Sequence, residues 1–180
     1  MVIKILTIIS IFFLILFTGC SSVHANKWKS PSDILNLNLQ PGDIIVKEKE
    51  LTPKGVFGHA AIMKTSYIIA DYPMLGEKYY ELGLASWIED DRDMIVLRLK
   101  NVNEDFKNKL IFNMELYSNF YYKISLNKKD NSGFYCSQYA WFVYYITAKE
   151  FNINLDLDSD GGFFVFPYDF LNSSYLEVVK

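Results

Sequence analysis

One segment of the sequence, residues 134–151, constrains the fold more than any other. Residues 134–146 read FYCSQYAWFVYYI, so that aromatic and aliphatic side chains occupy most of these positions. A helix of this composition is apolar on all sides and is stable only where other elements cover it. We therefore predict a helix in the centre of the domain, with the rest of the chain packed around it.

The segments that precede this helix carry strand patterns. Turn residues separate four apolar or β-branched runs, and residues 82–87 fit a short strand or a turn. The four runs are residues 44–46, 58–63, 67–71 and 94–99. After Asn103, apolar residues at steps of three to four predict another helix. Strands followed by helices indicate an α+β domain.

The composition is that of one weakly acidic globular domain. The 180 residues include 18 basic and 21 acidic side chains, which gives a formal net charge of -3. Domains that neutralise phosphates usually carry a basic excess, so we expect no nucleic-acid partner. The 2 Cys and 2 His are too few for a disulfide framework or a zinc finger. We expect no metal and no cofactor, and the oligomeric state stays open.

The N-terminus has the pattern of an export signal. Lys4 precedes an apolar run from Ile5 to Phe17, and TGCSS follows at residues 18–22. The segment resembles a bacterial lipoprotein signal, in which a peptidase cuts just before a lipid-bearing cysteine, here Cys20. The alternative is an uncleaved membrane helix, for which the run is short, because a span needs roughly 20 apolar residues.

The lipoprotein resemblance divides the chain into a signal peptide at 1–19, a tether at 20–30 that carries the lipidated Cys20, and a domain at 31–180. Loss of the one lysine in the signal changes the formal net charge from -3 to -4. The domain is then expected outside the cytoplasm, anchored to a membrane of the bacterial cell envelope by its lipid. Cys136 is left without a disulfide partner.

Cys136 stands near the start of the predicted central helix. Free N–H groups and partial positive charge at a helix N-terminus lower the pKa of a thiol and favour the nucleophilic thiolate. Such a nucleophile needs a base, normally a histidine. His24 lies in the tether, so His59, at the start of a predicted strand, is the candidate. The alternative is an inert core cysteine and a histidine without a chemical role.

A histidine base works best when a third polar group orients it. Asp71 ends the strand that follows His59 and is the candidate, although an ordinary strand-end carboxylate fits the pattern equally well. A slip of one residue in register turns a strand over, and Ala70 would then take this place instead.

Three sequence blocks carry a resemblance to a known family: PGDIIV at 41–46, GHAAI at 58–62 and FYCSQYAWFVYY at 134–145. On these blocks the chain resembles the YiiX/YebB-like branch of the NlpC-type papain-like cysteine hydrolases. The resemblance implies a circularly permuted papain-like fold, with an antiparallel sheet packed against the Cys-bearing helix. It also implies that Cys136 is the nucleophile and His59 the base, whereas the third catalytic position matches Asp71 or Ala70.

The resemblance implies a hydrolase of amide or ester bonds that acts through a thioester acyl-enzyme. Its expected substrates are peptide-like or lipid-like molecules of the cell envelope. The alternative is a non-catalytic binding lipoprotein that keeps the fold. Residues 156–161 match the first half of a calcium-binding loop, but Pro167 stands where the bidentate Glu belongs, which favours a solvated acidic turn.

Overall fold

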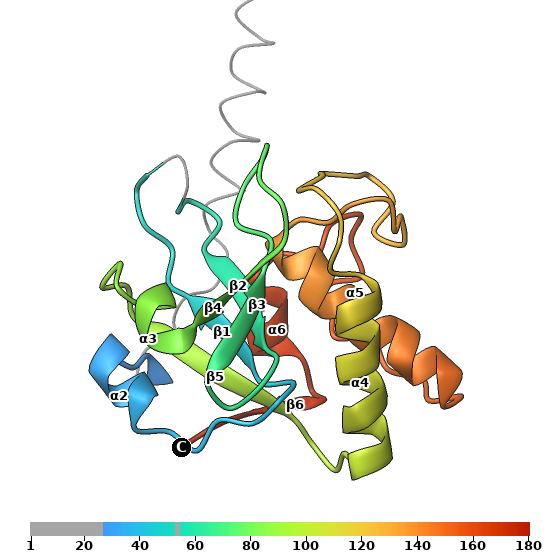
Figure 1. Ribbon diagram of the computed structural model, residues 1–180, viewed down its shortest axis with the longest axis horizontal. Helices are drawn as coiled ribbons and strands as arrows, with labels where there is room; N and C mark the ends of the chain where they lie inside the picture. Colours follow the sequence, from blue (N-terminus) through green and yellow to red (C-terminus); the bar gives the residue numbers. More distant parts are fainter. Residues whose placement is uncertain (1–26, 53–54) are drawn as a thin grey trace, which may run out of the picture.

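The computed structural model describes residues 27–52 and 55–180 (Figure 1). The signal peptide predicted at 1–19, the lipidation site Cys20 and His24 lie outside these residues. No helix among the described residues combines the length and the apolar character that a membrane crossing requires.

A six-stranded antiparallel sheet in the order β4-β3-β2-β1-β5-β6 forms the middle of the described domain. The strands are β1 (Ile44–Lys47), β2 (His59–Met63), β3 (Ile68–Asp71), β4 (Tyr80–Gly83), β5 (Met94–Leu99) and β6 (Leu176–Val178). The four strands predicted from apolar runs are confirmed to within one residue at each end. The prediction did not include β6, which is three residues long and therefore too short to show a period.

Five helices accompany the sheet in the part of the chain that the structure describes. They are α2 (Pro31–Leu35), α3 (Leu84–Trp87), α4 (Glu104–Leu116), α5 (Cys136–Glu150) and α6 (Asp169–Asn172). The helix predicted after Asn103 is confirmed as α4, and the Asn103 side chain caps it by accepting the Phe106 N–H at 2.9 Å. Residues 82–87 divide between β4 and α3, since one helical turn lets Leu84 and Trp87 bury on the same side.

Helices cover both faces of the sheet, because successive strand residues point to opposite sides (Figure 1). The set that packs with α4 and α5 comprises Ile44, Val46, Ala60, Ile62 and Ala70. The alternate set, which packs with α2 and α3, comprises Ile45, Ala61, Met63 and Ile69. The prediction that α5 is buried is confirmed for most of its residues, but the sheet and not the helix forms the middle of the domain, because α5 covers one face of the sheet and leaves Lys149 and Glu150 exposed. The α+β class is confirmed.

Folded contacts begin inside the segment assigned to the tether. The Trp28 ring lies 5.7 Å from the ring of Tyr168, and the Lys29 N–H donates to the Met94 carbonyl at 2.8 Å. The chain is therefore held against the domain from Trp28 onward, before the start of α2.

A buried ion pair connects the turn before β1 to β5. Arg98 donates from Nε to Oδ1 of Asp43 and from Nη2 to Oδ2, both at 2.7 Å. The Gln40 N–H also donates to Oδ2 of Asp43, at 2.8 Å. The Asp of the PGD turn thus has a structural role far from Cys136.

Replacement of Arg98 should destabilise the fold and leave the chemistry of Cys136 unchanged. Arg98→Met leaves the buried Asp43 carboxylate without its cation, so we expect the free energy of unfolding in urea to fall by roughly 2–4 kcal/mol. Lys100→Met is the matched control, because the amine of exposed Lys100 donates to the Ser174 carbonyl and holds no buried carboxylate. Equal losses in the two variants would contradict this assignment.

Candidate active site

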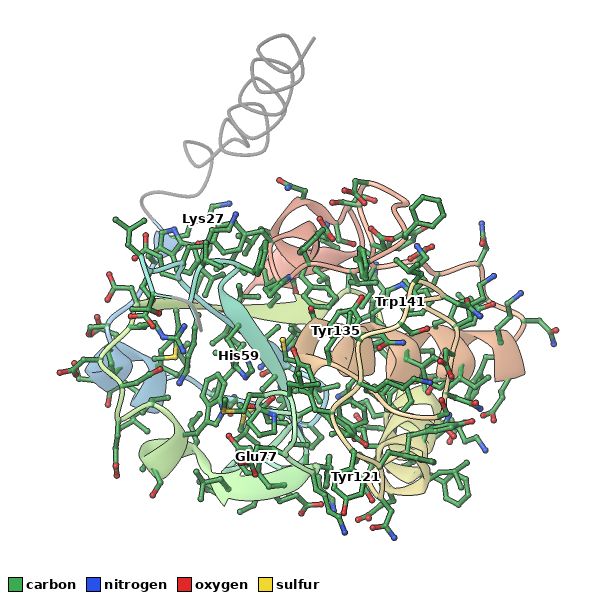
Figure 2. All side chains as sticks on the ribbon, turned by 90° about the horizontal axis from the view of Figure 1, so that it is seen from above. Lys27, His59, Glu77, Tyr121, Tyr135 and Trp141 are labelled. Carbon is green, nitrogen blue, oxygen red and sulfur yellow. The ribbon has the colours of Figure 1, made fainter. Side chains whose placement is uncertain are left out.

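The first residues of two elements meet at one end of the sheet. Cys136 begins α5 and His59 begins β2, both line one cavity, and each side chain shifts the pKa of the other. Figure 2 shows His59 and Tyr135, the residue before Cys136, near the middle of the molecule in the view from above. Cys136 is a free, half-buried cysteine whose sulfur lies 3.9 Å from the Ser137 hydroxyl oxygen. The structure thus brings together the two residues singled out from the sequence.

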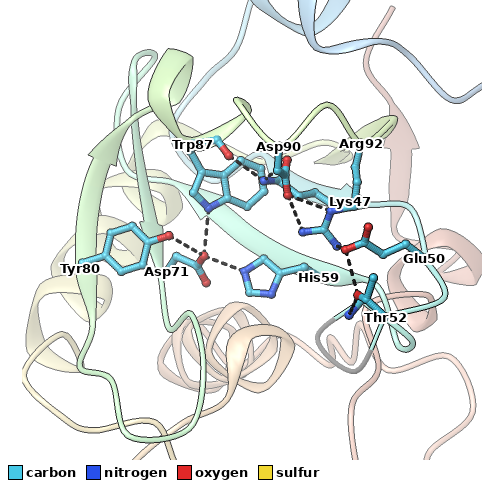
Figure 3. Close-up of polar contacts among 10 residues, drawn as sticks. Lys47, Glu50, Thr52, His59, Asp71, Tyr80, Trp87, Asp90 and Arg92 are labelled. Carbon is cyan, nitrogen blue, oxygen red and sulfur yellow. Dashed lines mark hydrogen bonds and ion pairs between the residues drawn. The ribbon is translucent and has the colours of Figure 1, made fainter.

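Asp71 faces His59 from the end of β3. Its Oδ2 lies 2.6 Å from Nε2 of His59 and also accepts the indole N–H of Trp87 at 2.9 Å and the hydroxyl of Tyr80 at 3.2 Å (Figure 3). The residue is only 1% exposed, so these donors replace the water that Oδ2 has lost, whereas Oδ1 is buried without a hydrogen-bond partner. The register places Asp71 beside His59, while Ala70 packs into the core against α4 and α5.

The charges at the site reinforce one another. Burial lowers the pKa of His59, but the Asp71 carboxylate and the Cys136 thiolate, with their hydrogen bonds, outweigh it and raise that pKa to about 10. Burial raises the pKa of the Cys136 thiol, but the charge and hydrogen bond of His59 outweigh it and hold that pKa below its usual value. The arrangement therefore favours a thiolate–imidazolium pair at neutral pH.

A buried lysine, Lys47, contacts the tryptophan of this network. Nζ of Lys47 lies 3.7 Å from the centre of the Trp87 ring and donates to the Trp87 carbonyl at 2.6 Å and to Oδ1 of Asp90 at 2.8 Å. Burial lowers the pKa of Lys47 despite the nearby Asp90. Figure 3 shows Lys47, Trp87, Asp71 and His59 in one connected array. Lys47 thus holds Trp87 in place, and Trp87 holds Asp71.

The start of α5 is fastened to two neighbouring segments. The Gln138 side chain accepts the Tyr135 N–H at 3.4 Å and donates to the Asp130 carbonyl at 3.1 Å. The Ser137 hydroxyl donates to the Val165 carbonyl at 2.7 Å, and the Val165 N–H donates to the Tyr135 hydroxyl at 2.8 Å. Ser137 and Gln138 therefore build the frame around the cysteine.

Gly58 allows close packing next to His59. Its φ is +75°, and a Cβ at this position would lie 2.9 Å from the Lys47 carbonyl oxygen and 3.2 Å from the Tyr168 ring. Only glycine accepts both this backbone conformation and this crowding.

A cavity of about 960 Å³ opens over the three residues. Cys136, His59 and Asp71 all contribute to its lining, and most of the remaining wall is aromatic or aliphatic. A mostly apolar cavity with a few convergent polar groups is typical of a small-molecule site.

Tyr122 is a site residue that sequence reasoning missed. It lines the cavity, and burial, followed by the negative charges of Cys136 and Asp71, raises the pKa of its hydroxyl. The phenol therefore stays protonated and keeps its hydrogen-bond donor. The sequence contains 13 Tyr, and no pattern distinguishes this one.

Among the described residues, the group of three acidic side chains close enough to hold a metal ion does not include Cys136, His59 or Asp71. Elsewhere among the described residues, carboxylate oxygens of Asp158, Asp160 and Asp169 lie within 4.8 Å of one another. Asp158 already pairs with Lys128, and Asp169 accepts the Phe166 N–H. The cluster therefore has partners within the protein.

Comparisons with known proteins give one relationship. No protein-family model matches the sequence, and a search of curated proteins finds no match. Among solved structures, the chain is similar to the crystal structure of metalloprotein YiiX from Escherichia coli O157:H7. The TM-score is 0.57 at 15% sequence identity, over 79% of this chain and 97% of that chain. The chain therefore has a YiiX-like fold.

Removal of the Asp71 charge should lower the pKa of His59. Asp71→Asn keeps the size of the side chain and removes the charge that favours imidazolium, so we expect the pKa to fall from about 10 by more than about one unit. NMR titration of the His59 ring, assigned with a His59→Ala variant, measures this value. Asp90→Asn is the control, since Asp90 contacts Lys47. An unchanged pKa in Asp71→Asn would refute the coupling.

Proposed function

We propose that the protein is a cysteine hydrolase of amide or ester bonds, with a permuted papain-like arrangement of its catalytic residues. The observation that supports this most is the succession of Asp71, His59 and Cys136 in the cavity, with a 2.6 Å contact between carboxylate and imidazole. A carboxylate that orients a histidine, which in turn ionises a nucleophile, is the arrangement that acyl transfer requires.

In the proposed reaction, the Cys136 thiolate attacks the substrate carbonyl carbon and the carbonyl electron pair moves onto oxygen. The His59 imidazolium gives its proton to the leaving amine or alcohol as the C–N or C–O bond breaks, which leaves a thioester on Cys136. Neutral His59 then takes a proton from a water molecule that attacks the thioester. The C–S bond breaks, the acid leaves, and the thiolate–imidazolium pair is restored.

Two donors are available for the oxyanion. The backbone N–H of Cys136 is one of the free groups at the start of α5. Tyr122, which lines the same cavity, is proposed to offer its protonated hydroxyl as the second donor. Donors fixed in a site that excludes water stabilise the developing negative charge.

The composition of the cavity wall indicates the class of substrate. Its aromatic and aliphatic side chains favour a molecule with a large apolar part, and so lipid-derived amides or esters ahead of small polar peptides. This choice agrees with a location at a membrane, which the proposed lipid on Cys20 would provide.

Loss of either member of the dyad should abolish hydrolysis. We expect Cys136→Ala and His59→Ala to lower kcat/KM on p-nitrophenyl acyl esters by about a thousandfold or more, and Tyr122→Phe by about a hundredfold. Mass spectrometry should detect an acyl adduct on Cys136 of the unaltered protein. Lys100→Met serves as the control for handling and folding.

Alkylation of Cys136 by iodoacetamide separates the hydrolase from a binding protein with the same fold. The folded thiolate should react faster than the unfolded thiol at neutral pH, and His59→Ala should remove this advantage. Equal alkylation rates for the folded protein, the unfolded protein and His59→Ala would favour the non-catalytic binding function.

The proposed anchor has its own test. Cys20→Ser removes the lipid attachment site, so we expect the protein to leave the membrane fraction of cells that produce it. Retention of the variant in that fraction would instead favour an uncleaved membrane helix at residues 1–19.

A further inference from the structure

The mouth of the cavity carries exposed apolar side chains that the proposed chemistry does not require. Leu75 is 71% exposed and Ile124 60%, although both line the cavity. The full set, here called the apolar rim, is Phe57, Met74, Leu75, Leu82, Ile124 and Phe166. Single exposed apolar residues are common, but a group gathered around one opening marks an interaction surface.

The apolar rim comes from separate segments that meet on one face. They are the residues before β2, the β3–β4 connection with the adjoining part of β4, the loop between α4 and α5, and the loop before α6. Figure 1 shows the loops at the upper end of the sheet, and Figure 2 looks down on that end. A broad ring of loop tips suits a flat partner better than a single peptide.

The start of the described chain lies beside this face. Trp28 packs on Tyr168, whose hydroxyl accepts the Lys49 N–H at 2.9 Å and whose ring borders Gly58, a residue of the cavity wall. Residues 21–26 alone separate Cys20 from Lys27. A chain of this length spans at most about 25 Å, at roughly 3.5 Å per residue. A lipid on Cys20 would therefore keep the mouth close to the bilayer.

Two cation–aromatic pairs accompany the apolar rim. Nζ of Lys49 lies 4.3 Å from the centre of the Tyr168 ring, and Nζ of Lys78 lies 4.7 Å from that of Tyr121. Lysine and tyrosine both have an apolar body and a polar tip, which suits them to the headgroup region of a membrane.

We propose that the apolar rim docks on the surface of a phospholipid bilayer, so that the cavity opens directly onto the membrane. The proposal rests on the anchor proposed at Cys20. Because the apolar rim encircles the opening, a second copy of the chain seated on it would close the cavity, whereas a bilayer supplies apolar substrates to it.

Fluorescence quenching in vesicles tests the docking. The full chain with Cys136→Ala receives Leu75→Cys or Ile124→Cys, is labelled with an environment-sensitive fluorophore, and is reconstituted in phosphatidylcholine–phosphatidylglycerol vesicles that contain a nitroxide-labelled lipid. Ile153→Cys is the matched control, since Ile153 is 48% exposed but follows the far end of α5, about 22 Å along the helix from Cys136. The Cys136→Ala chain without an added cysteine reports any label taken up by Cys20.

We expect quenching at Leu75 and Ile124 to exceed that at Ile153 by about twofold or more, and to persist in high salt because apolar contact drives it. Equal quenching at the three positions, with the protein still bound to vesicles, overturns the docking alone. Protein that stays in the aqueous fraction overturns the docking and the anchor together. A change in fluorophore emission that depends on the amount of protein per vesicle, and not on the nitroxide lipid, indicates a second copy of the chain and also overturns the docking. The proposed hydrolysis is tested separately, because each of these proteins lacks Cys136.

Discussion

The buried carboxylate of Asp71 is the constraint on which the rest of the site depends. A negative charge that has lost its water must be compensated by donors or cations nearby. Here β2 provides His59, α3 provides Trp87 and β4 provides Tyr80. The carboxylate raises the pKa of the imidazole, and the imidazolium in turn lowers the pKa of the Cys136 thiol. The positions of two strands and a short helix are therefore coupled to the charge on one sulfur atom.

The layered fold brings these groups together from separate parts of the chain. The two faces of the sheet bury alternate residues of β2 and β3 under different helices. The carboxylate and the tryptophan that supports it belong to the side covered by α3, whereas the nucleophile arrives with α5 from the other side. The site forms at the end of β2, where His59 can contact both. Neither layer contains the complete set of groups.

The parts that could be predicted are those with a period or a rare residue type. The apolar runs of the strands and the apolar α5 were evident because burial leaves a regular pattern. Cys136 and His59 stood out because the chain has 2 residues of each type. Asp71 stayed open because a strand pattern does not fix its own register. Trp87 and Tyr122 could not be found, since tertiary packing alone brings these aromatic residues to the cavity.

Gly58 shows that the site also restricts residues that do not react. It carries no functional group, yet its positive φ and the carbonyl oxygen 2.9 Å from the place of a Cβ leave no room for any side chain. Every replacement would strain the backbone directly before His59. Among descendants of this gene that keep the function, natural selection should therefore remove changes at position 58 as strictly as changes at the histidine itself, although glycine takes no part in the chemistry.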